Sequence, residues 1–115
     1  MEIERIEAAV ERWGERFLQR IYTPDELALC QGRMPELAAR FAAKEAVSKA
    51  LGTGMRGISW REMEILRDEQ GRPQLHLHGR ARTKAEELGP LEWAISLSHS
   101  RDYAVALVVA LERPT

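Results

Sequence analysis

The chain has 115 residues, of which 44% are hydrophobic and 30% charged, and its single Cys excludes a disulfide scaffold and a cysteine-based zinc cluster. Its 17 Lys and Arg against 18 Asp and Glu give a net charge of -1, which argues against a dedicated nucleic-acid-binding protein, and no apolar run approaches the roughly 20 residues of a membrane-spanning helix. This size is typical of one globular domain, so we expect a single domain over residues 1–115, in a soluble cytoplasmic protein without nucleic-acid or membrane partners.

The N-terminal half predicts three helical segments. Apolar residues recur at steps of three and four in the first segment, which is typical of an amphipathic helix, and Gly14 interrupts it. Residues 23–26 read Thr-Pro-Asp-Glu, a capping box with proline at the first helical position, so a second helix begins there. A third helix, rich in Ala, should begin at Pro35 and end at Gly52.

After a glycine-rich break, the hydrophobic period changes from helical to two. Residues 62–65 and 74–78 alternate apolar and polar side chains around a turn at 68–71, which predicts a β-hairpin. A short helix should follow over residues 80–88, and a second hairpin should pair two apolar strands, residues 93–97 and 103–111. We therefore expect an α+β fold, with N-terminal helices followed by antiparallel β-hairpins.

The last predicted strand is apolar on both faces, which is typical of a strand buried on both sides. Large side chains form one face: Tyr103, Val105, Leu107, Val109 and Leu111. Small side chains form the other: Ala104, Ala106, Val108 and Ala110. In so small a domain another subunit would supply the second cover, and we expect the subunit interface over the small face or its neighbours.

Glu45 and Lys49 lie one turn apart on the third helix. Their spacing favours a surface ion pair, because Glu followed by Lys at i+4 is a common helix stabiliser. In the functional alternative, Glu45 is an oxygen ligand for Mg²⁺ and Lys49 is a cation for phosphate oxygens or a proton acceptor.

His99 ends an apolar strand, between Ser98 and Ser100 and next to Arg101. Either this histidine is a satisfied structural residue, or the two hydroxyls, the imidazole and the guanidinium bind a phosphate.

Three other side chains favour plain structural roles. His76 and His78 share one strand face without an apparent third ligand, so we interpret them as solvent-facing, and Cys30 as a buried small hydrophobic residue.

Four arginines would form a basic stripe if the N-terminal helix continued past Gly14: Arg5, Arg12, Arg16 and Arg20. The stripe is either a solvated face balanced by neighbouring glutamates or a surface for an acidic partner.

Residues 39–54, Ala-Arg-Phe-Ala-Ala-Lys-Glu-Ala-Val-Ser-Lys-Ala-Leu-Gly-Thr-Gly, resemble the signature of the holo-[acyl-carrier-protein] synthases, the small bacterial class of 4'-phosphopantetheinyl transferases. Its Phe-x-x-Lys-Glu-x-x-x-Lys pattern is the strongest element. Further similar segments follow in order along nearly the whole chain: residues 2–6, 16–27, 57–60, 96–100 and 103–106.

The resemblance implies transfer of the phosphopantetheine arm of coenzyme A to a serine of an apo acyl carrier protein, with Mg²⁺ and release of adenosine 3',5'-bisphosphate. By matching position, Glu45 would be a metal ligand, and Lys49 would contact the phosphates or help to deprotonate the serine. Arg40, Lys44 and His99, with Lys49, would belong to the coenzyme A site.

The resemblance also implies partners. The family's site lies between protomers of a homotrimer, which agrees with a last strand that is apolar on both sides. Acyl carrier proteins are acidic, and the match places Arg5 and Arg16 on the surface that docks them.

Two departures from the family pattern matter. The family carries Gly-x-Asp-Ile/Val, with an Asp metal ligand, just before the position of Met1, so we expect a start site placed too late or a trimmed chain. Ala94 stands where the family often has His.

The runner-up interpretation is a catalytically impaired module that binds coenzyme A or an acyl carrier protein, because that Asp is absent. Retention of Glu45, Lys49 and His99 together favours the transferase.

Overall fold

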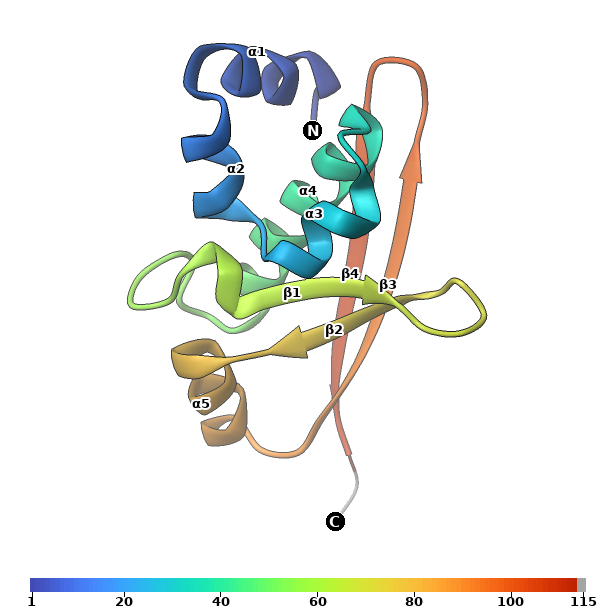
Figure 1. Ribbon diagram of the computed structural model, residues 1–115. Helices are drawn as coiled ribbons and strands as arrows, with labels where there is room; N and C mark the ends of the chain where they lie inside the picture. Colours follow the sequence, from blue (N-terminus) through green and yellow to red (C-terminus); the bar gives the residue numbers. More distant parts are fainter. Residues whose placement is uncertain (114–115) are drawn as a thin grey trace.

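The computed structural model describes residues 1–113. Its first half is helical, and its second half contains four strands and one further α-helix (Figure 1). In chain order they are α1 (Ile3–Trp13), α2 (Glu15–Ile21), α3 (Pro24–Cys30), α4 (Met34–Ala50), a 3-10 turn (Trp60–Glu62), β1 (Met63–Arg67), β2 (Pro73–Leu77), α5 (Gly79–Glu87), β3 (Leu91–His99) and β4 (Ala104–Glu112). The predicted α+β fold is confirmed.

Local signals in the sequence set the helix boundaries. Gly14 has a φ of 56°, a left-handed conformation that favours glycine, and it separates α1 from α2 where the break was predicted. The predicted capping box at the start of α3 is also present: Thr23 Oγ1 accepts a hydrogen bond from the Glu26 N–H, and Glu26 Oε1 accepts one from the Thr23 N–H.

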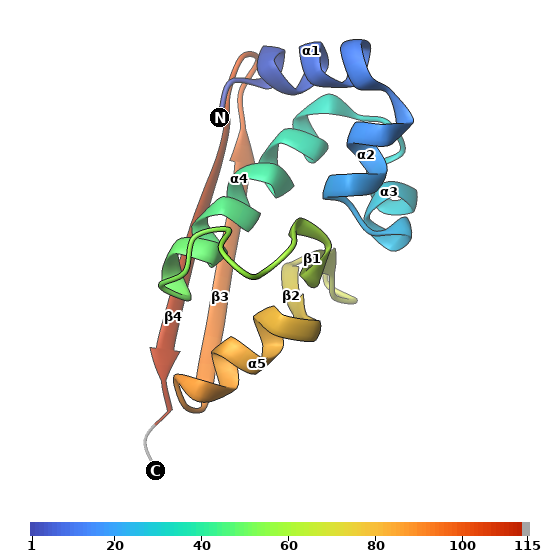
Figure 2. The ribbon, with the colours of Figure 1, turned by 90° about the vertical axis from the view of Figure 1, so that its left-hand side faces the viewer.

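Both predicted hairpins are present. β1 pairs with β2 in antiparallel register from Met63 opposite Leu77, and β3 pairs with β4 from Leu91 opposite Glu112 to His99 opposite Ala104. The second hairpin is the longer one, and α4 runs along one of its faces while β1, β2 and α5 lie farther along the same side (Figures 1 and 2).

The small face of β4 packs against α4 of the same chain. Ala104 is buried with Ala38 and Ala39, and Val108 packs against a cluster that contains Val47 and Leu51. The part of the expectation that placed a subunit contact on the small face itself is therefore wrong, because α4 of the same chain covers that face. Because α4 presents alanines, the hairpin approaches it through its own small residues, and the bulky side chains point outward.

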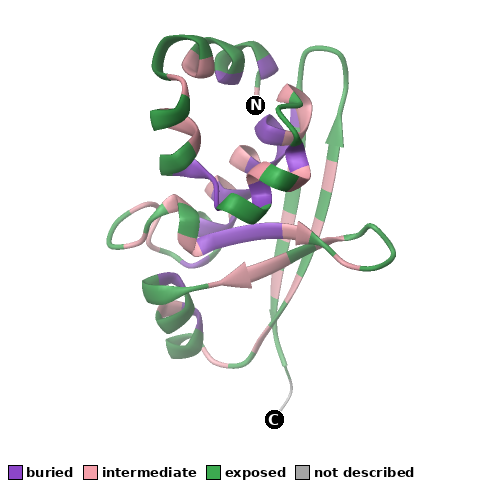
Figure 3. Ribbon diagram, in the orientation of Figure 1, coloured by how far each residue is buried: buried purple, intermediate pink, exposed green. Residues whose placement is uncertain are grey.

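The large face of β4 is consequently exposed in the protomer. Its residues keep 38% to 62% of their surface accessible: Tyr103, Val105, Leu107, Val109 and Leu111. The hairpin is accordingly coloured mainly as exposed or intermediate in Figure 3.

The N-terminal residues are tied to the start of β4. The Met1 amino group donates to the Ala104 carbonyl at 2.9 Å, and the Ala104 N–H donates to the Met1 carbonyl at 2.8 Å. This pairing fixes the beginning of α1 against the tip of the hairpin. Within residues 1–113, no helix has the length and apolar character needed to cross a bilayer.

Candidate active site

The C-terminal half of α4 carries Glu45 and Lys49. Glu45 is half-buried and Lys49 is exposed. Among residues 1–113 no ion pair joins them, so the surface ion pair favoured by their spacing does not form. Both charged groups therefore face outward from the helix without a charged partner in the described chain.

A pocket of about 290 Å³ lies at the other half of α4. Its polar walls come from three elements: Glu36 from α4, Arg67 from the end of β1, and Ser98 and His99 from the end of β3. His99 is half-exposed, and its Nε2 lies 3.9 Å from Glu36 Oε1.

Glu36 organises the cations around this pocket. Its Oε2 accepts hydrogen bonds from Arg40 Nη1 at 2.9 Å and from Arg67 Nη2 at 2.7 Å. Partial burial raises the pKa of Glu36, but the hydrogen bond from Arg40 and the charges of Arg40 and Arg67 outweigh it and hold the pKa below its ordinary value. The carboxylate is therefore ionised at neutral pH.

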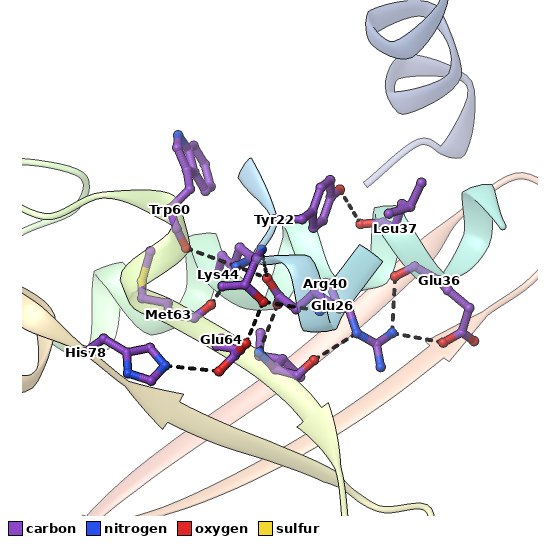
Figure 4. A network of polar contacts seen from close by, with 12 residues as sticks. Tyr22, Glu26, Glu36, Leu37, Arg40, Lys44, Trp60, Met63, Glu64 and His78 are labelled. Carbon is purple, nitrogen blue, oxygen red and sulfur yellow. Dashed lines mark hydrogen bonds and ion pairs between the residues drawn. The ribbon is translucent and has the colours of Figure 1, made fainter. Parts of the chain in front are cut away.

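Arg40 is fully buried behind Glu36. Its Nε donates to the Ile65 carbonyl at 3.0 Å, and Nη1 contacts Glu36 (Figure 4). Its Nη2 is the one buried side-chain nitrogen or oxygen without a hydrogen-bond partner within residues 1–113. An unpaired buried guanidinium nitrogen is unfavourable, so this donor is available to an anion that reaches it.

Lys44 is fully buried one turn after Arg40. Its Nζ donates to Glu26 Oε1, to the Trp60 carbonyl and to the Met63 carbonyl. Burial lowers the pKa of Lys44, and the neighbouring carboxylate of Glu26 opposes this shift. Since an ammonium has three donors, Lys44 has none left for a ligand.

Arg40 and Lys44 together attach α4 to the main chain of β1. Four helical residues advance about 6 Å, and two strand residues advance about 6.6 Å, so the two side chains reach carbonyls two positions apart, those of Ile65 and Met63. This match sets where α4 lies along the strand.

The predicted site residues thus form two groups. Arg40 and His99 meet at Glu36, whereas Glu45 and Lys49 follow Arg40 by five and nine residues in α4, about 8 and 14 Å along the helix axis. Glu36 could have been identified from its i, i+4 spacing to Arg40, but nothing local in the sequence indicates that Arg67 joins them.

A comparison with protein families matches residues 1–108 to the "4'-phosphopantetheinyl transferase superfamily". The chain belongs to this superfamily. The resemblance stated from the motif in residues 39–54 is therefore confirmed, and the chain is classed with the transferases.

Relatives of this transferase cover nearly its whole length. It is 50% identical to a holo-[acyl-carrier-protein] synthase of Herpetosiphon aurantiacus, over 96% of this chain and 93% of that one. It is 56% identical to the corresponding synthase of Dehalococcoides mccartyi, over 96% and 92%.

Solved structures show the same fold. The Helicobacter pylori holo-[acyl-carrier-protein] synthase, crystallised in complex with coenzyme A, is 32% identical with a TM-score of 0.87, over 96% of this chain and 95% of that one. The Neisseria meningitidis synthase is 39% identical with a TM-score of 0.86, over 97% and 93%.

The remaining candidates of this phosphopantetheinyl transferase lie apart from both groups. Cys30 is buried, as predicted. His78 is exposed but contacts Glu64 Oε1 at 3.0 Å, and His76 is half-buried, so the interpretation of both as solvent-facing holds only in part. Ser100 lies beside His99 and exchanges hydrogen bonds with the main chain of Tyr103.

The basic stripe is not one continuous helix face. Gly14 divides it, leaving Arg5 and Arg12 on α1 and Arg16 and Arg20 on α2, all exposed. The Arg12 guanidinium lies 4.9 Å from the ring centroid of the exposed Trp13.

Proposed function

We propose that this protein transfers the 4'-phosphopantetheine arm of coenzyme A to a serine hydroxyl of an apo acyl carrier protein. The observation that carries the proposal is the division of α4 into an outward-facing Glu45 and Lys49 at one end and an arginine- and histidine-lined pocket at the other. Membership of the superfamily and the coenzyme A complex of the similar H. pylori synthase support it.

The reaction exchanges one P–O bond for another. The serine oxygen bonds to the phosphorus that carries the pantetheine arm, and the bridging pyrophosphate bond breaks. Adenosine 3',5'-bisphosphate leaves and the serine proton is released. Lys49 would contact the phosphate oxygens or help to take that proton. His99 and Arg67, which line the pocket beside Glu36, would hold the anionic nucleotide end of coenzyme A, and the unpaired Nη2 of Arg40 behind Glu36 would be available to it.

The residues fit a role for Mg²⁺. The Glu45 carboxylate is partly accessible and has no ion-pair partner within residues 1–113, and Mg²⁺ takes one or two protein carboxylates with water and substrate phosphates. Glu45 would hold the ion, which when bound neutralises charge on the pyrophosphate. No cluster of three metal-ligating side chains occurs in the described part of the chain, so substrate oxygens would complete the set.

We further propose a homotrimer in which neighbouring protomers share the site. The apolar face of β4 is exposed in the protomer, and soluble monomers rarely expose such a patch, so a second subunit would bury it. The separation of the two residue groups along α4 also favours a site completed by a second copy.

The carrier protein would dock on α1 and α2. Arg5 and Arg16 are exposed there, and an acidic partner is attracted to such a surface.

The test incubates the protein with coenzyme A, Mg²⁺ and apo acyl carrier proteins and follows the carrier's mass. A gain equal to the phosphopantetheine arm, dependent on the carrier's serine, is expected. Binding of coenzyme A without any mass gain for several carriers would instead favour the runner-up, a binding module.

A further inference from the structure

One buried side chain joins both ends of the segment that carries the candidate catalytic groups. Lys44 directly precedes Glu45 in α4, and its ammonium donates to Glu26 Oε1 at 2.8 Å, to the Trp60 carbonyl at 2.9 Å and to the Met63 carbonyl at 2.6 Å (Figure 4). The side chains of Lys44 and Glu26 are both 0% exposed. The ammonium therefore has no contact with solvent and no free donor.

The two carbonyls lie 16 and 19 positions after Lys44 in the sequence. Between them and Lys44 lie Glu45, Lys49 and the glycine-rich segment 52–57. Gly52, Gly54 and Gly57 of that segment all have positive φ, and glycine gives the backbone little stiffness of its own. The far end of the segment is attached to α4 through the hydrogen bonds of Lys44, next to the stacking of the Trp60 ring on Phe41.

Glu26 is held as firmly as Lys44. Its Oε1 also accepts from the Thr23 N–H at 2.9 Å, and its Oε2 accepts from the Ile65 N–H at 2.9 Å. The lysine is thus attached to the start of α3 and to β1 at once. A buried ion pair adds little net stability compared with apolar packing, and its best-attested use is to select one arrangement.

We infer that Lys44 is a positioning residue: its ammonium fixes residues 45–59 against β1 and α3, so that Glu45 and Lys49 keep one orientation, and it does not itself touch coenzyme A. The catalytic part of this inference rests on the proposed function. It assigns Lys44 a different task from the coenzyme A contact that the family resemblance implied.

The test compares Lys44→Met with Val47→Ala. Methionine is unbranched like lysine and one atom shorter, and it has no donor. Val47 is a fully buried residue on the same helix outside the polar network, so its truncation is a control for lost stability. Since Lys44→Met leaves the Glu26 carboxylate without its cation, the double variant Glu26→Gln/Lys44→Met, which removes both buried charges, is measured beside it.

Two readouts are taken on variants that remain folded by circular dichroism. Amide hydrogen exchange of residues 51–59 should rise about tenfold or more in Lys44→Met and in the double variant, and stay within about twofold in Val47→Ala. The kcat of transfer should fall about 10- to 100-fold in both lysine variants, with the KM for coenzyme A within about twofold.

Two results would overturn the inference. A raised KM for coenzyme A with unchanged exchange and kcat would make Lys44 a direct ligand. Equal exchange and kcat losses in Val47→Ala at matched stability would reduce Lys44 to an ordinary core residue. If the wild-type protein transferred nothing to any carrier, the proposed function would fail, and the exchange measurement alone would decide the positioning role.

Discussion

Lys44 and Glu45 are neighbours in the sequence but lie in opposite surroundings. Lys44 is fully buried with three hydrogen bonds, whereas Glu45 is half-buried and has no ion-pair partner within residues 1–113. Successive helical residues point about 100° apart, so α4 directs the Lys44 ammonium into the protein and the Glu45 carboxylate outward.

Replacing Glu45 by Gln should remove most transfer activity. The amide keeps the shape of the side chain but loses the charge that would hold Mg²⁺, and we expect kcat to fall about 100-fold or more, the scale of losing one group that stabilises developing charge. Carrier mass against time at several Mg²⁺ concentrations measures it. Glu86→Gln on α5, an exposed change of the same kind, is the control. Full activity of Glu45→Gln at low Mg²⁺ would remove Glu45 from the metal site.

Reversing the charge of Arg5 should weaken binding of the carrier protein and leave coenzyme A binding unchanged. Attraction between an exposed cation and an acidic partner is long-ranged and is screened by salt, so the difference between wild type and Arg5→Glu should shrink as salt increases. Calorimetric titration measures both affinities. Arg82→Glu makes the same change in net charge on α5 and should have little effect. Salt-independent carrier binding, equal in both variants, would leave the N-terminal arginines as a solvated face.

Leu107→Asp should dissociate the proposed trimer. Leu107 lies in the middle of the exposed apolar face of β4 and is 62% exposed in the protomer, so an aspartate there would be buried without a partner on assembly. Light scattering should give three times the protomer mass for wild type and a single protomer mass for the variant, with Gln74→Asp on β2 as control. A wild-type protein that is monomeric at micromolar concentration would contradict the shared site.

Glu64 should make the protein sensitive to acid. Burial raises the pKa of Glu64, but hydrogen bonds from Thr23 and His78 outweigh it and lower the pKa below its ordinary value. The folded state then binds fewer protons than the unfolded state. The resulting stability is present above about pH 4.3 and is lost as the pH falls further toward the lowered pKa. Urea unfolding of wild type and Glu64→Gln should show a smaller loss of stability below that pH in the variant, and parallel pH curves would disprove the effect.

Local signals predicted the framework of this fold well. Gly14, the capping box at Thr23 and the two hairpin turns act within a few residues of where they stand, and the structure follows each of them. The spacing of Glu45 and Lys49 on α4 favoured a surface ion pair, which does not form, and it was the family resemblance that indicated the two as candidate site residues.

Long-range packing was not predictable in the same way. Lys and Arg are rarely fully buried, so the sequence did not predict the burial of Arg40 and Lys44. Carbonyls of β1, together with the carboxylates of Glu36 and Glu26, accept their hydrogen bonds. Both faces of β4 are apolar, so alternation alone could not tell which one meets α4. That choice follows from the alanines of α4, which admit the small face.

The attachment of α4 to β1 has a consequence for redesign of this protein. Arg40 and Lys44 donate hydrogen bonds to main-chain carbonyl oxygens, which every amino acid at positions 63 and 65 would have. β1 should therefore tolerate new side chains of similar volume without moving the helix, whereas any exchange at position 40 or 44 alters the docking itself. A library of apolar side chains of similar volume at positions 63 and 65, which are fully buried, should keep helix placement, and one that randomises positions 40 and 44 should not.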